Sequence, residues 1–76
     1  MAELLAFLAR ELVDEPGAVR VESEERHGEL VLLLHVAPDD VGKVIGRGGR
    51  IIRALRTVMR AAATRDGRRV LVEIAE

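Results

Sequence analysis

A cluster of glycines between two pairs of aliphatic residues constrains the fold of this chain more than any other feature. Three glycines fall within four positions of the segment VIGRGGRII, residues 44–52. A glycine costs a helix interior about 1 kcal/mol relative to alanine, so a helix cannot run through this segment. Amphipathic patterns lie on both sides of it. The chain is therefore expected to turn sharply between a short helix over 39–45 and a longer helix over 50–64.

The longer helix has two chemically opposite sides. When successive residues are placed 100° apart around a helix axis, apolar residues fall on one side and arginines on the opposite side. The apolar side holds Ile51, Ile52, Leu55, Val58, Met59 and Ala62, and the cationic side holds Arg50, Arg53, Arg56 and Arg60. Asp66-Gly67 is expected to end this helix.

The remaining elements follow from periodicity and from turn residues. Leucines at helical spacing, with Phe7 beside them, predict a core-facing helix over 2–14 that ends before Pro16-Gly17. Alternation predicts strands over 18–25 and 69–75, and a continuous apolar run predicts a central strand over 30–36. A hairpin turn is expected at His27-Gly28-Glu29.

This order, α-β-β-α-α-β, predicts an α+β fold. The first two strands pair as a hairpin, and a right-handed two-helix crossover brings the third strand parallel to a neighbour, 30–36. The result is a three-stranded mixed sheet covered on one face by helices. Val31 and Leu33 are expected to point away from the helices, toward a face that a second protein could cover.

Composition limits the class of protein. The 76 residues fit one domain, 1–76, and 49% of them are apolar, which is enough for a small core. The chain has no cysteine, which favours a reducing, cytoplasmic setting. Its apolar runs are too short to span a bilayer, and acidic Glu3 stands where a signal peptide needs basic residues, so no membrane association or export is expected.

The net charge of −1 hides a strong segregation of charge. Residues 1–42 carry a net charge of −7, residues 43–69 carry +8 and the last seven carry −2. Cations concentrated in one part of an otherwise acidic chain indicate a local anionic partner.

The glycine turn supplies the chemistry that such a partner needs. Amides of the turn and of the first turn of helix 50–64 are expected to lack internal partners, at the positive end of the helix dipole. Spread cations fit a phosphodiester backbone better than a compact polyphosphate. The expected binding residues are Lys43, Ile45, Gly46, Arg47, Gly48, Gly49, Arg50, Ile52 and Arg53, whereas Arg56 and Arg60 are expected to be solubilising or partner-facing.

Placed between two helices in this order of elements, VIGRGGRII resembles the GXXG core of a type II KH domain. The segment PDDVGKVIGRGGRIIRALRTVMRAAA also resembles the small bacterial KhpA family. In KH domains the loop, here Gly46 to Gly49, clamps about four nucleotides of backbone. The resemblance implies single-stranded RNA binding in the cytoplasm, RNA-chaperone-like regulation, self-association to a homodimer and partnership with a larger KH protein, KhpB. It also implies a link to cell shape.

Composition suggests how bases are held. Phe7 is the one aromatic residue, so bases cannot stack on aromatic platforms as they do in many single-strand binders. An aliphatic groove, arginine planes and an edge strand must serve instead. The aliphatic residues available near the turn are Val41, Val44, Ile45, Ile51 and Ile52. Few phosphates are within reach, so a single copy should bind weakly with a shallow salt dependence.

Two other classes of protein fit less well, and a third is compatible with RNA binding. A helix-turn-helix DNA reader would leave the strands surplus and has no Asn or Gln for adenine readout. A nucleotide-binding enzyme lacks the phosphate-loop spacings, and no nucleophile has a base beside it, so we expect no enzyme, cofactor, metal or small-molecule substrate. A protein-protein assembly module that uses the open face of the sheet is compatible with RNA binding.

Overall fold

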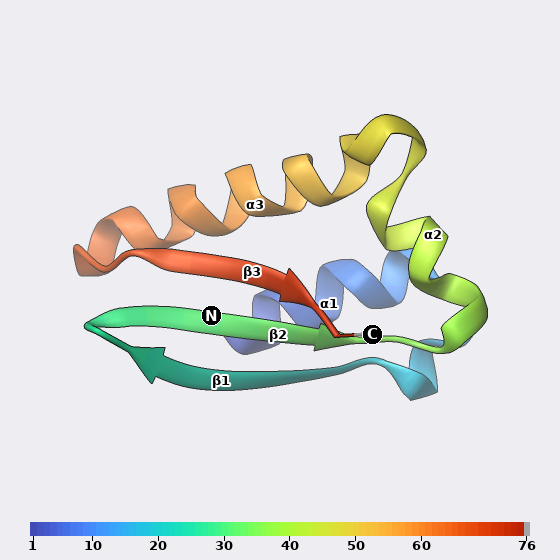
Figure 1. Ribbon diagram of the computed structural model, residues 1–76, viewed down its shortest axis with the longest axis horizontal. Helices are drawn as coiled ribbons and strands as arrows, with labels where there is room; N and C mark the ends of the chain where they lie inside the picture. Colours follow the sequence, from blue (N-terminus) through green and yellow to red (C-terminus); the bar gives the residue numbers. More distant parts are fainter. Residues whose placement is uncertain (76) are drawn as a thin grey trace.

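The computed structural model describes residues 1–75, apart from the Asp66 side chain, and Figure 1 shows helices lying against one sheet. The helices and strands are α1 (Ala2–Leu12), β1 (Arg20–Arg26), β2 (Glu29–His35), α2 (Val41–Ile45), α3 (Arg50–Ala63) and β3 (Val70–Ile74). Single turns of 3-10 helix occupy Pro16–Ala18, Pro38–Asp40, Arg47–Gly49 and Thr64–Asp66. The predicted α+β class and element order are confirmed. No helix among the described residues is long and apolar enough to cross a membrane.

Element ends differ from the predicted ones where local geometry intervenes. The first helix ends at Leu12 rather than at residue 14, because Val13 adopts extended geometry with φ −105° and ψ 163°. The first strand begins at Arg20 rather than at residue 18, because Pro16–Ala18 closes a 3-10 turn. The predicted helix over 39–45 divides into the turn Pro38–Asp40 and α2.

The sheet has the predicted mixed topology. Its strand order is β1-β2-β3, with β1 antiparallel and β3 parallel to the central β2. Arg26 lies opposite Glu29, so the hairpin loop consists of His27 and Gly28. Both loop residues have positive φ, 50° and 81°, as in the tight turns whose twist matches that of paired strands.

The core fills the space between α1, α3 and one face of the sheet. Its most buried residues include Leu5 and Ala9 of α1, Met59 of α3 and Leu32 of β2, each 0% exposed. Phe7 was expected on the core side of the first helix, and this is wrong, because its side chain is 57% exposed. Small Ala6 and Ala9 face inward and let α1 approach closely, which turns position 7 toward solvent.

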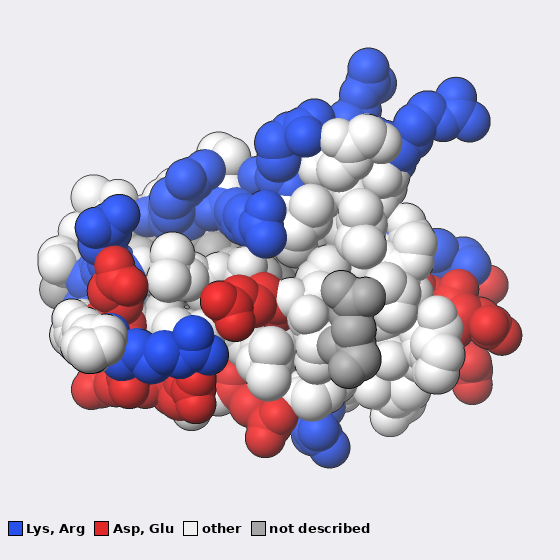
Figure 2. Space-filling view, in the orientation of Figure 1, with Lys and Arg blue, Asp and Glu red and all other residues white. Residues whose placement is uncertain are grey.

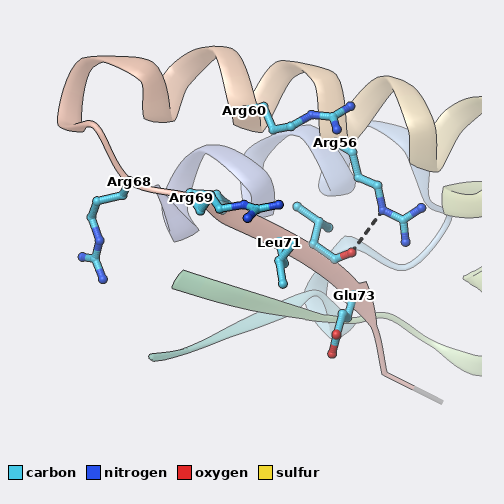
Figure 3. A pocket seen from close by; sticks show the side chains of 8 residues that line it. Arg56, Arg60, Arg68, Arg69, Leu71 and Glu73 are labelled. Atoms are coloured by element: carbon cyan, nitrogen blue, oxygen red, sulfur yellow. Dashed lines mark hydrogen bonds between the residues drawn. The ribbon is translucent and has the colours of Figure 1, made fainter. Parts of the chain in front are cut away.

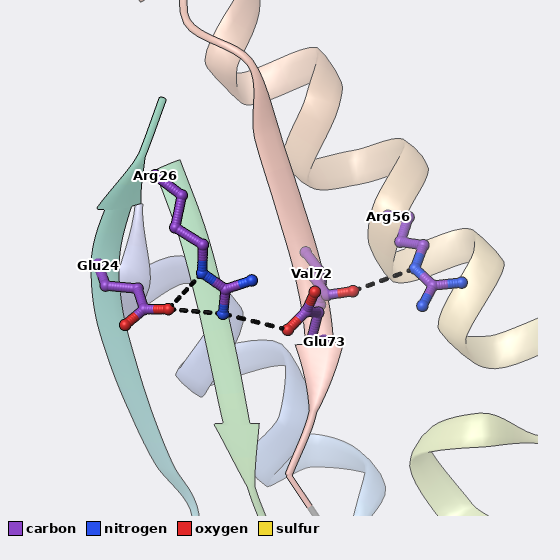
Figure 4. A network of polar contacts seen from close by, with 5 residues as sticks. All are labelled: Glu24, Arg26, Arg56, Val72 and Glu73. Atoms are coloured by element: carbon purple, nitrogen blue, oxygen red, sulfur yellow. Dashed lines mark hydrogen bonds and ion pairs between the residues drawn. The ribbon is translucent and has the colours of Figure 1, made fainter. Parts of the chain in front are cut away.

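The other face of the sheet is covered by its own charged side chains. Val31 lies outside the helix-side core cluster, as predicted for its face, yet is only 1% exposed. Its cross-strand partners are Glu24 and Leu71. Arg26 of β1 pairs with Glu24 and reaches Glu73 of β3 at 3.6 Å (Figure 4). Because long charged side chains cover apolar surface with their stems, this face offers no bare apolar patch at Val31.

Candidate nucleic-acid interface

The glycine turn joins α2 to α3 at one end of the molecule (Figure 1). Gly46 has φ 76° and ψ 169°, a conformation that is nearly restricted to glycine. A Cβ there would also stand 2.9 Å from the backbone nitrogen of Ile51. Gly49 has left-handed geometry with φ 77°, and its missing Cβ would stand 3.2 Å from Nη1 of Arg53. Gly46 is therefore required by the shape of the turn, and a side chain at Gly49 would need left-handed backbone and a shift of the Arg53 guanidinium.

Some amides of the turn have partners inside the chain, and others do not. Gly46 N–H donates to the Gly42 carbonyl at 2.9 Å, and Gly49 N–H donates to the Gly46 carbonyl at 3.1 Å. Arg50 N–H donates to the Arg47 carbonyl. The expectation that all these amides lack partners is therefore wrong. Arg47 and Gly48 are exposed, and the described residues supply no partner for either amide.

The predicted cations around the turn divide into free and engaged ones. Arg47 and Arg50 are exposed, and within residues 1–75 neither forms an ion pair. Arg53 instead folds back, and its Nη1 donates to the Gly48 carbonyl at 2.8 Å. Arg47 and Arg50 thus supply charge that an external anion can neutralise.

Lys43 takes part in a carboxylate network that anchors α2. Its Nζ lies 3.3 Å from Asp14 Oδ2 and 3.5 Å from Asp40 Oδ1, and the hydrogen bond and charge of Asp14 raise the lysine pKa. Asp40 is 1% exposed and accepts the backbone N–H groups of Asp14 and Glu15. Desolvation raises the pKa of Asp40, but these backbone hydrogen bonds together with Lys43 outweigh it, so its pKa lies below the ordinary value. Lys43 is therefore more engaged with this anchor than the sequence indicated.

The two predicted aliphatic binding residues lie at different depths. Ile45, the last residue of α2, is half-buried and packs against the edge of the core. Ile52, in the first turn of α3, is 7% exposed and belongs to the core itself. Of the two, Ile45 offers the larger surface to a bound molecule.

A groove lies between α3 and β3, on the side of α3 that carries Arg56 and Arg60. Its cavity volume is about 470 Å³. We call it the cationic groove, and its lining residues are Arg56, Arg60, Arg68, Arg69, Val70, Leu71, Val72 and Glu73 (Figure 3). Arg56 and Arg60 were expected to face solvent or a partner, because the sequence does not show that β3 lies beside that side of the helix. Figure 2 shows Lys and Arg gathered along this edge of the molecule.

The floor of the cationic groove includes the free edge of β3. The Arg69 carbonyl accepts a hydrogen bond from Leu30 N–H of β2, and Ala75 N–H donates to the Leu34 carbonyl of β2. Ladder alternation then turns the backbone groups of Val70, Val72 and Ile74 toward the open edge. Arg56 Nε donates to the Val72 carbonyl at 3.2 Å, which joins α3 to this strand (Figures 3 and 4).

The opposite flank of α3 is apolar. A shallow cavity of about 250 Å³ lies between α3 and α1, and its lining is Leu8, Glu11, Leu12, Ile51, Ala54, Leu55 and Val58. Leu4, Phe7 and Val58 are exposed by 36%, 57% and 43%. We call these three residues together with the cavity lining the apolar face. The sequence did not predict this face, because Phe7 was expected on the buried side of α1.

Comparison with known proteins identifies the fold and the family. Residues 2–74 match the family model described as "KhpA/KhpB, KH domain". The chain belongs to the KhpA/KhpB KH-domain family. This confirms the resemblance that the glycine turn and its flanking helices indicated.

Relatives named RNA-binding protein KhpA match this chain over almost its whole length. The one from Caldanaerobacter subterraneus subsp. tengcongensis is 49% identical over 74 residues, which cover 97% of this chain and 99% of the relative. The one from Treponema pallidum is 50% identical, over 97% of this chain and 92% of the relative. The one from Aquifex aeolicus is 43% identical, over 100% of this chain and 96% of the relative.

Solved structures show the same fold inside a larger protein. A crystal structure of Aquifex aeolicus Era matches 96% of this chain and 28% of Era, with a TM-score of 0.64 and 21% identity. A second structure, of Era in complex with MgGDPNP and nucleotides 1506–1542 of 16S ribosomal RNA, matches with the same values. At this identity the likeness concerns the fold alone.

Proposed function

We propose that this protein binds single-stranded RNA, without catalysis, through the glycine turn and the cationic groove. The observation that carries the proposal is the exposed turn, where the amides of Arg47 and Gly48 face solvent beside two arginines that form no ion pair within the described part of the chain. Such a site suits the phosphates of a polynucleotide backbone. The name of the family's KhpA relatives, RNA-binding protein, supports the same chemistry for this chain.

The spread of the cations favours a polymer over a compact anion. From Arg50 to Arg60 the rise along α3 is about 15 Å. The cationic groove then adds Arg68 and Arg69 from the segment that enters β3. A single nucleotide cannot contact both ends of this track, whereas a strand of several nucleotides can.

The bases are proposed to lie against the free edge of β3. Leu71 is 38% exposed and supplies apolar surface in the groove. The outward backbone groups of Val70 and Ile74 can bond base edges, and guanidinium planes of Arg56 and Arg60 can stack on bases. Phe7 lies on α1, away from this groove, so aromatic stacking plays no part. Weak, weakly selective binding by one copy follows.

Double-stranded DNA suits the site less well. α2 spans only the five residues Val41–Ile45, and the chain has no Asn or Gln to read adenine. Competition between a short single-stranded RNA and duplex DNA at matched salt separates the two readings. Stronger displacement by the DNA would favour a helix-turn-helix function instead.

We propose that a second copy covers the apolar face, which gives a dimer with two RNA sites. α1 and α3 run antiparallel beside this cavity (Figure 1). A two-fold axis along the helices therefore places α1 opposite α3 of the other copy. The exposed apolar side chains Phe7 on α1 and Val58 on α3 are then covered by the other copy. The same face suits a larger KH protein of the KhpB type.

Avidity from such pairing would compensate for weak binding by one site. A small RNA binder of this kind, acting in the cytoplasm, suits the role of an RNA chaperone or post-transcriptional regulator. We propose that role for the paired protein rather than for the single copy.

Replacement of Arg47 and Gly48 by aspartate tests the RNA proposal. Gly48 has φ 65°, which aspartate tolerates, and open space where its Cβ would stand, so the fold should survive. Fluorescence anisotropy with a short labelled RNA should show affinity reduced by about tenfold or more, and thermal unfolding should change little.

The matched control carries Arg10→Asp and Ala18→Asp, which alter net charge equally at exposed positions outside the glycine turn and the cationic groove. It should retain most of the affinity. If the turn variant binds RNA as well as the control does, the proposed site is wrong.

A further inference from the structure

The guanidinium of Arg53 lies on the glycine turn rather than out in solvent. Its Nη1 donates to the Gly48 carbonyl at 2.8 Å. The same nitrogen would stand 3.2 Å from a Cβ on Gly49, so the guanidinium fills the space above that residue. Arg53 therefore packs against the two glycines at the centre of the turn.

This contact restrains the carbonyl side of the peptide group between Gly48 and Gly49, whose N–H side is held by the Gly46 carbonyl. Gly48 and Gly49 have φ 65° and 77°, and neighbouring glycines can reach several other backbone conformations at little cost. A flip of the peptide between them would break the hydrogen bond from Gly49 N–H to the Gly46 carbonyl. It would also turn the Gly48 carbonyl oxygen toward solvent.

An outward carbonyl would weaken an anion site. Carbonyl oxygen carries partial negative charge and repels phosphate, whereas N–H groups attract it. By holding the Gly48 carbonyl away from the approach path, Arg53 leaves the exposed amides of Arg47 and Gly48 as the groups that a phosphate meets. The arginine thus shapes the site from behind.

We infer that Arg53 is a positioning residue for RNA binding, which acts through the conformation of the turn and not as a phosphate contact. The inference rests on the proposed function of the turn. It separates Arg53 from Arg47 and Arg50, whose guanidinium groups have no ion-pair partner among residues 1–75 and are free to meet phosphates.

Salt dependence distinguishes a positioning residue from a phosphate contact. Loss of a phosphate contact makes the plot of log affinity against log salt concentration less steep by about 0.7 for a single strand. We compare Arg53→Gln with Arg50→Gln, since both remove one charge from neighbouring turns of α3 and glutamine keeps a similar helix propensity. Each variant is titrated with the same short single-stranded RNA at four salt concentrations.

Arg53→Gln should weaken binding by about threefold to tenfold, the usual effect of one lost hydrogen bond, with an unchanged salt slope. Arg50→Gln should weaken binding with a shallower slope. If Arg53→Gln instead makes the slope as shallow as Arg50→Gln does, or leaves affinity unchanged, the positioning role is overturned.

A measurement without RNA keeps this test separate from the proposed function. In the free protein, amide ¹⁵N relaxation at Gly48 and Gly49 should report greater mobility in Arg53→Gln than in the parent or in Arg50→Gln. Equal mobility in all three proteins would overturn the inference. If mobility rises as expected but the parent itself binds no RNA, Arg53 still orders the turn and only the proposed function fails.

Discussion

The two flanks of α3 differ in what they expose, although one helix of fourteen residues supplies a wall to each. On the side of β3, the cationic groove brings four arginines around an edge strand. On the side of α1, the apolar face exposes Phe7 and Val58 around a cavity with almost no polar lining. The contrast teaches that two sides of one helix can carry opposite chemistry, and the proposed function gives the charged side to a polymer and the apolar side to a protein.

The separation of these flanks has a simple physical origin. Helical periodicity places Arg53, Arg56 and Arg60 on one stripe of α3 and Ala54 and Val58 on another. Desolvation of arginines in a protein interface would be costly, and an apolar stripe gains nothing from phosphate. The proposed function therefore places each partner on its own flank, and variants of one flank should spare the other.

The largest expected effect comes from Gly46→Ala, which should damage both flanks at once. The new Cβ would meet the Ile51 backbone, and φ 76° with ψ 169° is strained for alanine, so we expect a loss of about 3 kcal/mol or more in the free energy of unfolding. Chemical denaturation measures it. The matched control is Gly42→Ala in α2, where a Cβ meets no atom within 4 Å, and stability should stay equal or rise slightly. Equal stability of the two variants would contradict the described turn.

Asp40→Asn should lower the unfolding midpoint by several degrees, because it weakens the network that anchors α2 below the turn. The folded pKa of Asp40 lies below the ordinary value of 3.8. Its ionised form therefore stabilises the fold above that pH, and this contribution is lost as pH falls through the lower folded pKa. The stability difference between parent and variant should be constant near neutrality and shrink in that acidic range.

Asp39→Asn is the matched control for this prediction, because Asp39 occupies the same 3-10 turn but is exposed. Calorimetry across pH should show little change for it. A stability difference for Asp40→Asn that stays the same down to strong acid would refute the anchoring role.

Phe7→Glu should weaken pairing through the apolar face by about tenfold or more in the dimer dissociation constant, since the proposed dimer would bury this aromatic side chain and the variant puts a charge there. Sedimentation equilibrium measures it, and RNA affinity per subunit should be retained. Leu33→Glu places the same charge on the opposite, open face of the sheet as a control. Pairing that falls only with Leu33→Glu would move the interface to that face.

The smallest expected effect is that of Arg60→Gln in the cationic groove. It should weaken RNA binding by about twofold to fivefold and make the salt slope shallower by about 0.7, with no change in pairing. Arg65→Gln removes an equal charge from a residue that does not line the groove, so it should have the smaller effect. If the two variants bind RNA equally well, the cationic groove is not part of the RNA-binding surface.

Local chemistry in the sequence was sufficient for the turn and the hairpin. The glycines of VIGRGGRII and the pair His27-Gly28 adopt positive φ angles. These conformations depend on the residues themselves and on their neighbours in the sequence. The continuous apolar run from Leu30 to Leu34, with its flanking turns, likewise indicated the central strand. These features depend on contacts close in the chain, and they were predicted correctly.

Features that join distant segments could not be predicted in the same way. Every position from Leu4 to Leu8 is apolar, so sequence alone could not choose the buried side of α1, and the close approach allowed by Ala6 decided against Phe7. The Asp40 anchor joins this residue to Asp14 and Glu15, which lie 26 and 25 positions earlier in the chain. The cationic groove likewise needs β3 beside α3, which only the assembled sheet provides.

Mapping of amide chemical shifts during titration with a short single-stranded RNA tests the central claim most directly. We predict shifts at Arg47 and Gly48 that continue into Leu71 and Val72 of β3, while Phe7 and Val58 stay unchanged. Shifts confined to the apolar face or to the charged face of the sheet, with none at the glycine turn, would contradict the account.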